Sequence, residues 1–170
     1  VLARVEGEGA LHLQIRDGRI ERLQLEIYEP PRLFEQFLAG RSHEEVPDMV
    51  ARICGICPVA YQISAVNALE DAMGITVEPW VESLRRALYC GEWIQSHCLH
   101  IHMLAAPDFF GLSSAIEMAK EHPGPVRRVL YLQGVGNDLM KLIGARSVHP
   151  VNVRTGGFHH APDPGAVQSM

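Results

Sequence analysis

Two cysteines separated by two residues, Cys54 and Cys57, are the side chains with the clearest capacity for chemistry. Sulfurs at this spacing can bind one metal ion or form a redox pair, and Gly55 favours a tight turn that points both sulfurs the same way. Pro58 follows directly and is typical of a first helical position, so the helix N-terminus would favour the thiolate form that binds metal. The spacing alone therefore favours metal or redox use over two small buried residues.

The two other cysteines do not complete a four-sulfur site. Cys90 and Cys98 lie eight residues apart on one predicted helix, so they are about 12 Å apart along its axis and cannot chelate one ion together. We interpret them as small core residues and Cys54 with Cys57 as half a metal site. A half zinc site and a thioredoxin-like redox pair remain alternatives at this point. Arg52 adds positive charge beside the two thiolates, although a surface ion pair would also explain it.

The hydrophobic pattern predicts the elements that must position these residues. Alternating apolar residues predict two antiparallel strands with a type I′ turn at Asp17-Gly18 and a bulge near Glu21-Arg22. After two prolines at 30–31 the spacing becomes helical, with helices over 58–73, 79–104 and about 125–143, the second ending before Pro107. The predicted fold is α+β in a single domain over 1–170, β-rich over 1–28 and a mainly helical bundle over 31–170.

Composition excludes several classes of protein. The 170 residues are 47% hydrophobic and 21% charged, which is globular composition, and the formal net charge of -5 comes without a basic cluster, so we expect no nucleic-acid partner. No run of about 18 to 20 apolar residues predicts a membrane span, and the N-terminus lacks the layout of a signal peptide. We therefore expect a cytoplasmic protein, in which thiols stay reduced.

Several segments together resemble one family. The run Arg-Ile-Cys-Gly-Ile-Cys-Pro at 52–58, with Arg-Val-Glu-Gly at 4–7, is similar to the N-terminal part of a nickel–iron hydrogenase large (alpha) subunit. Further segments resemble that subunit in the same order, at 32–41, 92–102, 106–108, 148–151 and 156–158. Their likeness is greatest to the cytoplasmic branch that is linked to NAD(P) or acts as a sulfhydrogenase.

The resemblance implies a role for each matching residue. Cys54 matches the terminal nickel ligand, and Cys57 matches the thiolate that bridges nickel to an iron carrying cyanide and carbon monoxide. Glu6 matches the glutamate that passes protons from the nickel, and Glu35 a carboxylate near a magnesium ion. With Arg52 beside the thiolates, these residues form the candidate site. Soft sulfur suits nickel and carboxylate oxygen suits magnesium.

Two positions depart from the family's usual pattern. Tyr61 stands four residues after Cys57, where many members have a histidine, and its hydroxyl can donate a similar hydrogen bond to sulfur. Ser96 stands where many members have an aspartate, which removes a charge near the metal.

The implied activity is reversible H2 oxidation and proton reduction at the Ni–Fe centre. Electrons would leave through an iron–sulfur small subunit, with NAD(P)/flavin diaphorase subunits as further partners. The second Cys-x-x-Cys of the family has no counterpart here, and a helix predicted from Asp163-Pro164 has barely begun at Met170. The fold is therefore expected to be incomplete at the C-terminus, and the chain alone is expected to be inactive. The alternatives are a non-catalytic relative of complex I and a small zinc or redox module.

Overall fold

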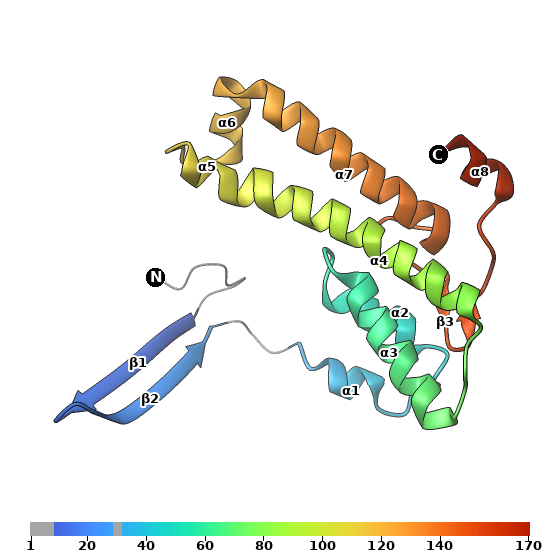
Figure 1. Cartoon of the computed structure of the whole chain (residues 1–170). Helices are drawn as coiled ribbons and strands as arrows, with labels where there is room; N and C mark the ends of the chain where they lie inside the picture. Colours follow the sequence, from blue (N-terminus) through green and yellow to red (C-terminus); the bar gives the residue numbers. More distant parts are fainter. Residues whose placement is uncertain (1–8, 29–31) are drawn as a thin grey trace. The chain divides into compact units, whose positions relative to one another are not determined.

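The computed structural model describes residues 9–28 and 32–170, in two compact units, Val1–Gln36 and Phe37–Met170 (Figure 1). One unit carries a two-stranded antiparallel sheet and the other is mainly helical, which confirms the predicted α+β fold. The single domain over 1–170 stays a prediction. Glu6 lies outside the described residues.

The first unit contains a β-hairpin, β1 (Gly9–Arg16) and β2 (Arg19–Ile27). Asp17 and Gly18 have φ angles of 48° and 74°, and positive φ at both positions is the type I′ geometry that the sequence predicted. Gln14 pairs with Arg22 but Ile15 pairs with Ile20, so Glu21 is the extra residue of a bulge. The predicted bulge is therefore confirmed, and it explains how apolar residues stay on one face of β2 although their spacing changes.

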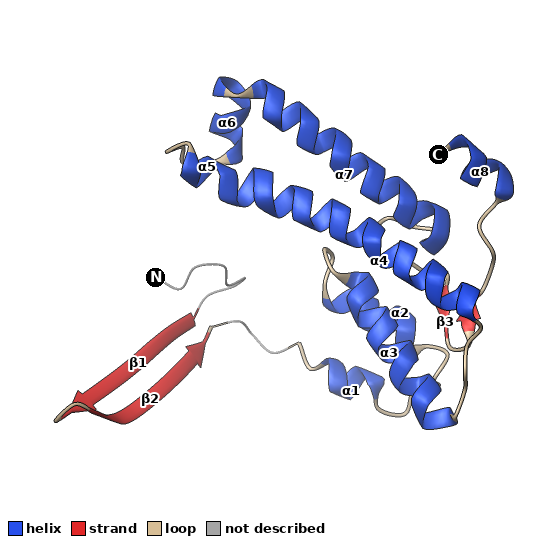
Figure 2. Ribbon diagram, in the orientation of Figure 1, coloured by secondary structure: helices blue, strands red, loops and turns tan. Residues whose placement is uncertain are grey.

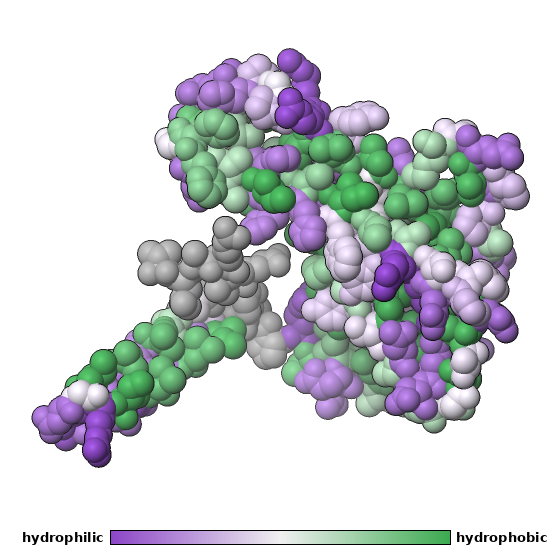
Figure 3. Space-filling view, viewed as in Figure 1, coloured by the Kyte–Doolittle hydropathy of each residue, from purple (hydrophilic) through white to green (hydrophobic). Residues whose placement is uncertain are grey.

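One face of this hairpin is apolar and exposed. Leu11 pairs with Leu25 and Leu13 with Leu23, and all four side chains are at least half exposed. Figure 3 shows the apolar side chains gathered along the hairpin. Because two strands alone bury little apolar surface, such a hairpin is marginally stable without further packing.

The second unit is built mainly from helices, which Figure 2 distinguishes from the strands. In chain order the elements after the hairpin are α1 (Phe34–Leu38), α2 (Val46–Val50), η1 (Ala51–Ile53), α3 (Pro58–Met73), α4 (Pro79–Leu99), η2 (His100–Ala105), α5 (Ala106–Phe109), α6 (Ala115–Glu121), α7 (Pro123–Gly144), β3 (Val153–Arg154), β4 (Gly157–Phe158) and α8 (Pro164–Ser169). Gly74 follows α3 in the left-handed conformation, directly after the predicted range 58–73, and Asp163 caps α8, as the sequence predicted.

The second long helix ends before Pro107, as predicted, but α4 stops at Leu99 and not at Leu104. Helical backbone continues past Leu99 as the π-helical stretch η2 and then as α5. The N–H of Ala106 bonds to the carbonyl of Ile101, five residues back, and this wider turn places Pro107 in the first turn of α5. A proline is tolerated there because its missing N–H would have had no partner.

Helices α4 and α7 run antiparallel and side by side (Figure 1). At their contact a Cβ added to Gly136 would lie 2.7 Å from the backbone oxygen of Gly91 and 2.7 Å from the backbone nitrogen of Gln95. Gly136 therefore allows α4 and α7 to pack closely. Gly134 has nothing within 4 Å of an added Cβ.

The end of α7 differs slightly from the predicted boundary. The helix ends at Gly144, one residue beyond the predicted range, and Ala145 takes the left-handed conformation, with φ 67°. An added Cβ on Gly144 would lie 2.8 Å from the Cβ of Pro150, so this glycine permits close packing of the following segment. The core of the unit joins α3, α4, α7 and β3 through Val59, Val66, Leu88, Met140, Ile143 and Val153. None of the helices over 9–28 and 32–170 is long and apolar enough to cross a membrane.

Candidate metal centre

The Cys54–Cys57 segment connects two helical elements. The short helix η1 ends at Ile53, Cys54 is extended, and Cys57 occupies the N-cap of α3. The structure joins the two sulfurs as a disulfide, with the Cα atoms 5.4 Å apart. The prediction that both sulfurs lie together at the start of the helix is therefore confirmed. Reduction of this pair would leave two thiols side by side.

The turn does not depend on Gly55 in the way that the sequence suggested. Gly55 is not among the described residues with positive φ, and a Cβ added to it meets no atom within 4 Å. The expectation that the turn needs the conformational freedom of glycine was thus wrong. The approach of the sulfurs comes instead from the extended Cys54 and from the backbone at Cys57, with φ −124° and ψ 38°.

A backbone hydrogen bond supports the first sulfur. The N–H of Cys57 donates to Sγ of Cys54 over 3.2 Å. In the reduced state such a donor stabilises a thiolate more than a thiol, because the hydrogen bond is stronger to the charged acceptor. Both cysteines are partly exposed, so an ion can reach the sulfurs. A pair of adjacent, accessible sulfurs with an N–H donor fits a soft metal such as nickel.

A distant segment of the chain braces the loop that carries the cysteines. Nδ1 of His149 lies 2.7 Å from the carbonyl oxygen of Ala51, in the helix just before Cys54. Nε2 of Gln62, on the second turn of α3, donates to the carbonyl of Pro150 over 2.6 Å. The segment 148–151, which the sequence linked to the family without a role, therefore contacts the backbone before the sulfur pair and the side chain of Gln62 after it.

Glu92 is a component of this region that the sequence interpretation missed. Glu92 lies on α4 and is only 2% exposed. Its Oε2 accepts a 2.6 Å hydrogen bond from the N–H of Val59. Burial raises the pKa of Glu92 to about 7, against the opposing effect of hydrogen bonds from the N–H groups of Val59 and Ala60. The sequence signal that could have found it was a glutamate at helical spacing from the apolar residues Val81 and Leu88, on the face of a long helix that is buried.

Arg52 and Glu35 are the other predicted site residues that the structure describes. Arg52 belongs to η1 and is exposed. Glu35 is exposed on α1, a helix that crosses the boundary between the two units at Gln36. Residues 9–28 and 32–170 contain no group of three or more histidine, cysteine, aspartate or glutamate side chains that could hold a metal ion. The described residues therefore bring together Cys54 and Cys57 only, and the roles of Glu6, Arg52 and Glu35 stay predictions.

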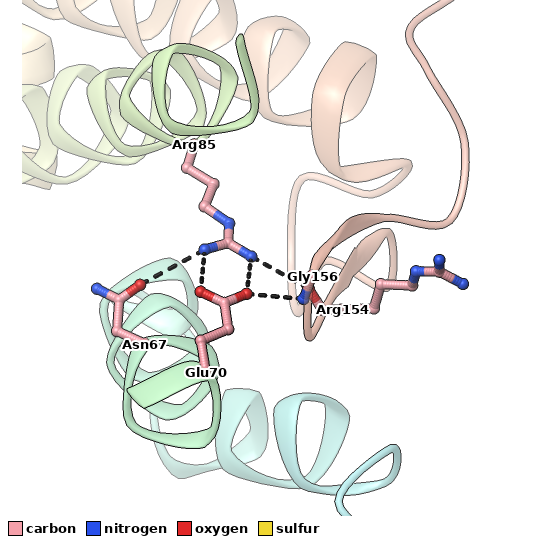
Figure 4. A network of polar contacts seen from close by, with 5 residues as sticks. All are labelled: Asn67, Glu70, Arg85, Arg154 and Gly156. Atoms are coloured by element: carbon pink, nitrogen blue, oxygen red, sulfur yellow. Dashed lines mark hydrogen bonds and ion pairs between the residues drawn. The ribbon is translucent and has the colours of Figure 1, made fainter. Parts of the chain in front are cut away.

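A second polar cluster holds together the elements around the site (Figure 4). Arg85 of α4 donates to both carboxylate oxygens of Glu70 on α3, at 2.8 and 2.6 Å, and both side chains are almost fully buried. Glu70 also accepts from the N–H of Gly156, and Arg85 donates to the carbonyl of Arg154. Burial alone raises the pKa of Glu70, but the hydrogen bonds from Arg85 and Gly156 and the charge of Arg85 lower it below its ordinary value. This network connects α3, α4 and the β3–β4 hairpin.

Comparison with known proteins identifies the family of the chain. The profile of the nickel-dependent hydrogenase family matches residues 32–125. The chain is 42% identical to the alpha subunit of sulfhydrogenase 2 from Pyrococcus furiosus, over 94% of this chain and 39% of that protein. It is 31% identical to the alpha subunit of the coenzyme F420 hydrogenase from Methanosarcina barkeri, over 98% of this chain and 38% of that protein.

Solved structures show the same relationship. The crystal structure of an NAD+-reducing [NiFe]-hydrogenase in the H2-reduced state superposes with a TM-score of 0.83 and 30% sequence identity, over 99% of this chain and 39% of that chain. The chain belongs to the nickel-dependent hydrogenase family, and its relatives include hydrogenase alpha subunits, as the resemblance implied. It spans about two fifths of the length of the relatives that it matches.

Proposed function

We propose that this chain supplies a thiolate pair, Cys54 and Cys57, to the Ni–Fe centre of a hydrogenase that oxidises H2 and reduces protons reversibly. The observation that carries the proposal is the adjacency of the two sulfurs at the start of α3, in a chain of the nickel-dependent hydrogenase family. A complex I-like role and a separate zinc or redox module account less well for this combination.

The proposed roles of the two sulfurs differ. Cys54 would hold nickel alone, and Cys57 would be shared between nickel and an iron that carries cyanide and carbon monoxide. When bound, this centre supplies the electron-accepting metal at which H2 is split. The chain's part is to present two reduced sulfurs on one side, with the Cys57 N–H supporting Cys54 and the helix N-terminus supporting Cys57. Arg52 contributes positive charge in the same segment.

The remaining ligands must come from outside the described residues. Two thiolates leave a four-thiolate site half filled, and the described part of the chain gathers no third metal-binding side chain there. We therefore propose that the other half of the centre is contributed by sequence that corresponds to the rest of the related alpha subunits. Without it, residues 1–170 are expected to be inactive.

The proton and cation roles rest on the family resemblance. Glu6 is proposed to accept the proton released at the metal and pass it toward solvent, which requires hydrogen-bond reach directly or through water. Glu35 is proposed to lie near a magnesium ion, since a carboxylate oxygen suits that hard cation. Glu6→Gln should block proton exchange with H2 while nickel stays bound, and unchanged isotope exchange would remove Glu6 from the pathway.

The proposed partners carry the electrons away. The relatives include hydrogenase alpha subunits, and one solved relative is NAD+-reducing, which supports NAD(P)/flavin diaphorase subunits and an iron–sulfur small subunit as partners. Of the four cysteines in the sequence, Cys54 and Cys57 are assigned to the metal, and Cys90 and Cys98 lie on one helix. The iron–sulfur clusters are therefore assigned to the partner subunit. A cytoplasmic location belongs to the same proposal.

The direct test is H2-dependent dye reduction by the assembled hydrogenase. Cys57→Ser should abolish it, because an alcohol oxygen is a poor substitute for a bridging thiolate. Cys90→Ser, a change at a free cysteine on α4, should retain activity and is the matched control. A Cys57→Ser enzyme that reduces dye at the wild-type rate would refute the proposed role.

A further inference from the structure

The first turn of α3 has no cap of its own. The first four backbone positions of a helix have no hydrogen-bond acceptor within the helix, and in α3 these are Cys57, Pro58, Val59 and Ala60. The side chain of Cys57 makes no capping hydrogen bond. Cys57 donates its N–H to Sγ of Cys54, and proline has no N–H. Val59 and Ala60 therefore need an acceptor from elsewhere, because unpaired backbone donors are costly to bury.

Glu92 provides that acceptor from another helix. Its Oε2 lies 2.6 Å from the nitrogen of Val59, 33 residues away in sequence, and the N–H of Ala60 also acts on the carboxyl as a donor that lowers its pKa. The residue is 2% exposed, so little water competes for these bonds. A carboxylate at this place also interacts favourably with the positive end of the α3 dipole.

The cap is only two residues from a sulfur. Between Val59 and Cys57 stands Pro58, whose ring fixes its own φ and leaves the backbone little freedom to absorb a shift of the helix. A displacement of the first turn of α3 would therefore be passed to Cys57 and change the distance between its Sγ and that of Cys54.

We propose that Glu92 is a positioning residue for the sulfur pair: by capping the first turn of α3 from α4, it holds Cys57 Sγ beside Cys54 Sγ. This deepens the proposed function, on which it rests, because one metal ion can use both sulfurs only if they are held together. A purely stabilising cap would affect the unfolding of the protein but leave the spacing of the sulfurs in the folded state unchanged.

Substitutions at Glu92 can separate its charge from its hydrogen bonds. Glu92→Gln removes the charge but keeps an oxygen of similar reach that can accept from Val59, whereas Glu92→Ala removes both acceptors. The comparison of the alanine and glutamine variants therefore isolates the cap. Glu82→Ala, at an exposed glutamate on the same helix, is the matched control.

The experiment measures how readily the two sulfurs meet in the folded, metal-free full-length chain. Each variant is equilibrated in glutathione buffers of stepped redox ratio, free thiols are alkylated, and the tryptic peptide of residues 53–85 is quantified by mass spectrometry in its disulfide and dithiol forms. This peptide contains Cys54 and Cys57 and no other cysteine. Circular dichroism verifies that every variant is folded, and hydrogen exchange at Val59 and Ala60 reports loss of the cap.

We expect the effective concentration of one thiol toward the other to fall at least about tenfold in Glu92→Ala, which is a shift of about 30 mV for two electrons. Glu92→Gln and Glu82→Ala should stay within about threefold of wild type. If Glu92→Ala does not fold, Glu92→Asp, one methylene too short, should show the same loss. The proposal would be overturned if the effective concentration in Glu92→Ala, or in Glu92→Asp where the alanine variant does not fold, equalled that in Glu92→Gln. The assay contains no nickel, so its outcome is independent of a failure of the proposed hydrogenase function.

Discussion

Val59, two residues after the second cysteine of the candidate metal centre, donates its N–H on α3 to the buried carboxylate of Glu92 on α4 in a 2.6 Å hydrogen bond. Together with the contact of His149 with Ala51, this bond ties the cysteine segment to distant parts of the unit. The sulfurs are thus positioned by tertiary contacts as well as by their spacing in sequence.

The buried ion pair between Arg85 and Glu70 should be important for stability. Arg85→Met leaves the carboxylate of Glu70 buried without its cation, and we expect a loss of about 3–5 kcal/mol in the free energy of unfolding. Arg41→Met removes an exposed pair with Glu45 and should cost no more than about 1 kcal/mol. Urea unfolding measures both. Equal small losses would show that the Arg85 network adds little.

Acid should weaken the same network. The pKa of Glu70 is lower in the folded chain than its ordinary value of 4.5, so its ionisation stabilises the fold above pH 4.5. This contribution is lost as the pH falls from 4.5 through the folded pKa. The difference in unfolding free energy between wild type and Glu70→Gln should therefore shrink below pH 4.5. A difference that is constant from pH 6 to pH 3 would contradict the ionised pair.

Glu92 should have the opposite dependence on pH. Its folded pKa of about 7 exceeds the ordinary 4.5, so the folded state holds a proton that the unfolded state has lost between these values. Its contribution to stability is full below pH 4.5 and declines as the pH rises to about 7, by ~3 kcal/mol in total. The difference in the free energy of unfolding between wild type and Glu92→Gln, measured from pH 4 to pH 8, should show this decline. A flat difference would mean that Glu92 titrates normally.

The glycines of α7 should respond differently to alanine. Gly136→Ala places a methyl group 2.7 Å from backbone atoms of α4, so the helices must separate and we expect a loss of about 1–3 kcal/mol. Gly134→Ala meets nothing within 4 Å and should stabilise the helix by about 0.5–1 kcal/mol. Thermal unfolding of the two variants tests the contrast. A stabilising Gly136→Ala would indicate that α4 and α7 are not in close contact.

Local signals in the sequence were sufficient for most elements and for the sulfur pair. The turn at Asp17-Gly18, the bulge at Glu21 and the start of α3 at Pro58 each depend on the conformational preferences of neighbouring residues. The roles of Glu92 and His149 depend on partners 33 and 98 residues away, which spacing cannot reveal. The π-helical stretch η2 was missed for a different reason, since its hydrogen bond spans five residues and the hydrophobic spacing does not distinguish it from α-helix.

The nickel content of the assembled hydrogenase tests the central claim most directly. The complex is isolated from cells that supply its partner subunits and metal-insertion machinery, and its nickel and zinc are measured by mass spectrometry for wild type, Cys54→Ser, Cys57→Ser and Cys90→Ser. We expect nickel in stoichiometric amounts in wild type and Cys90→Ser and only background nickel in the other two variants. Undiminished nickel in Cys54→Ser and Cys57→Ser, or zinc in place of nickel in the wild-type complex, would contradict the assignment of these two sulfurs to a Ni–Fe centre.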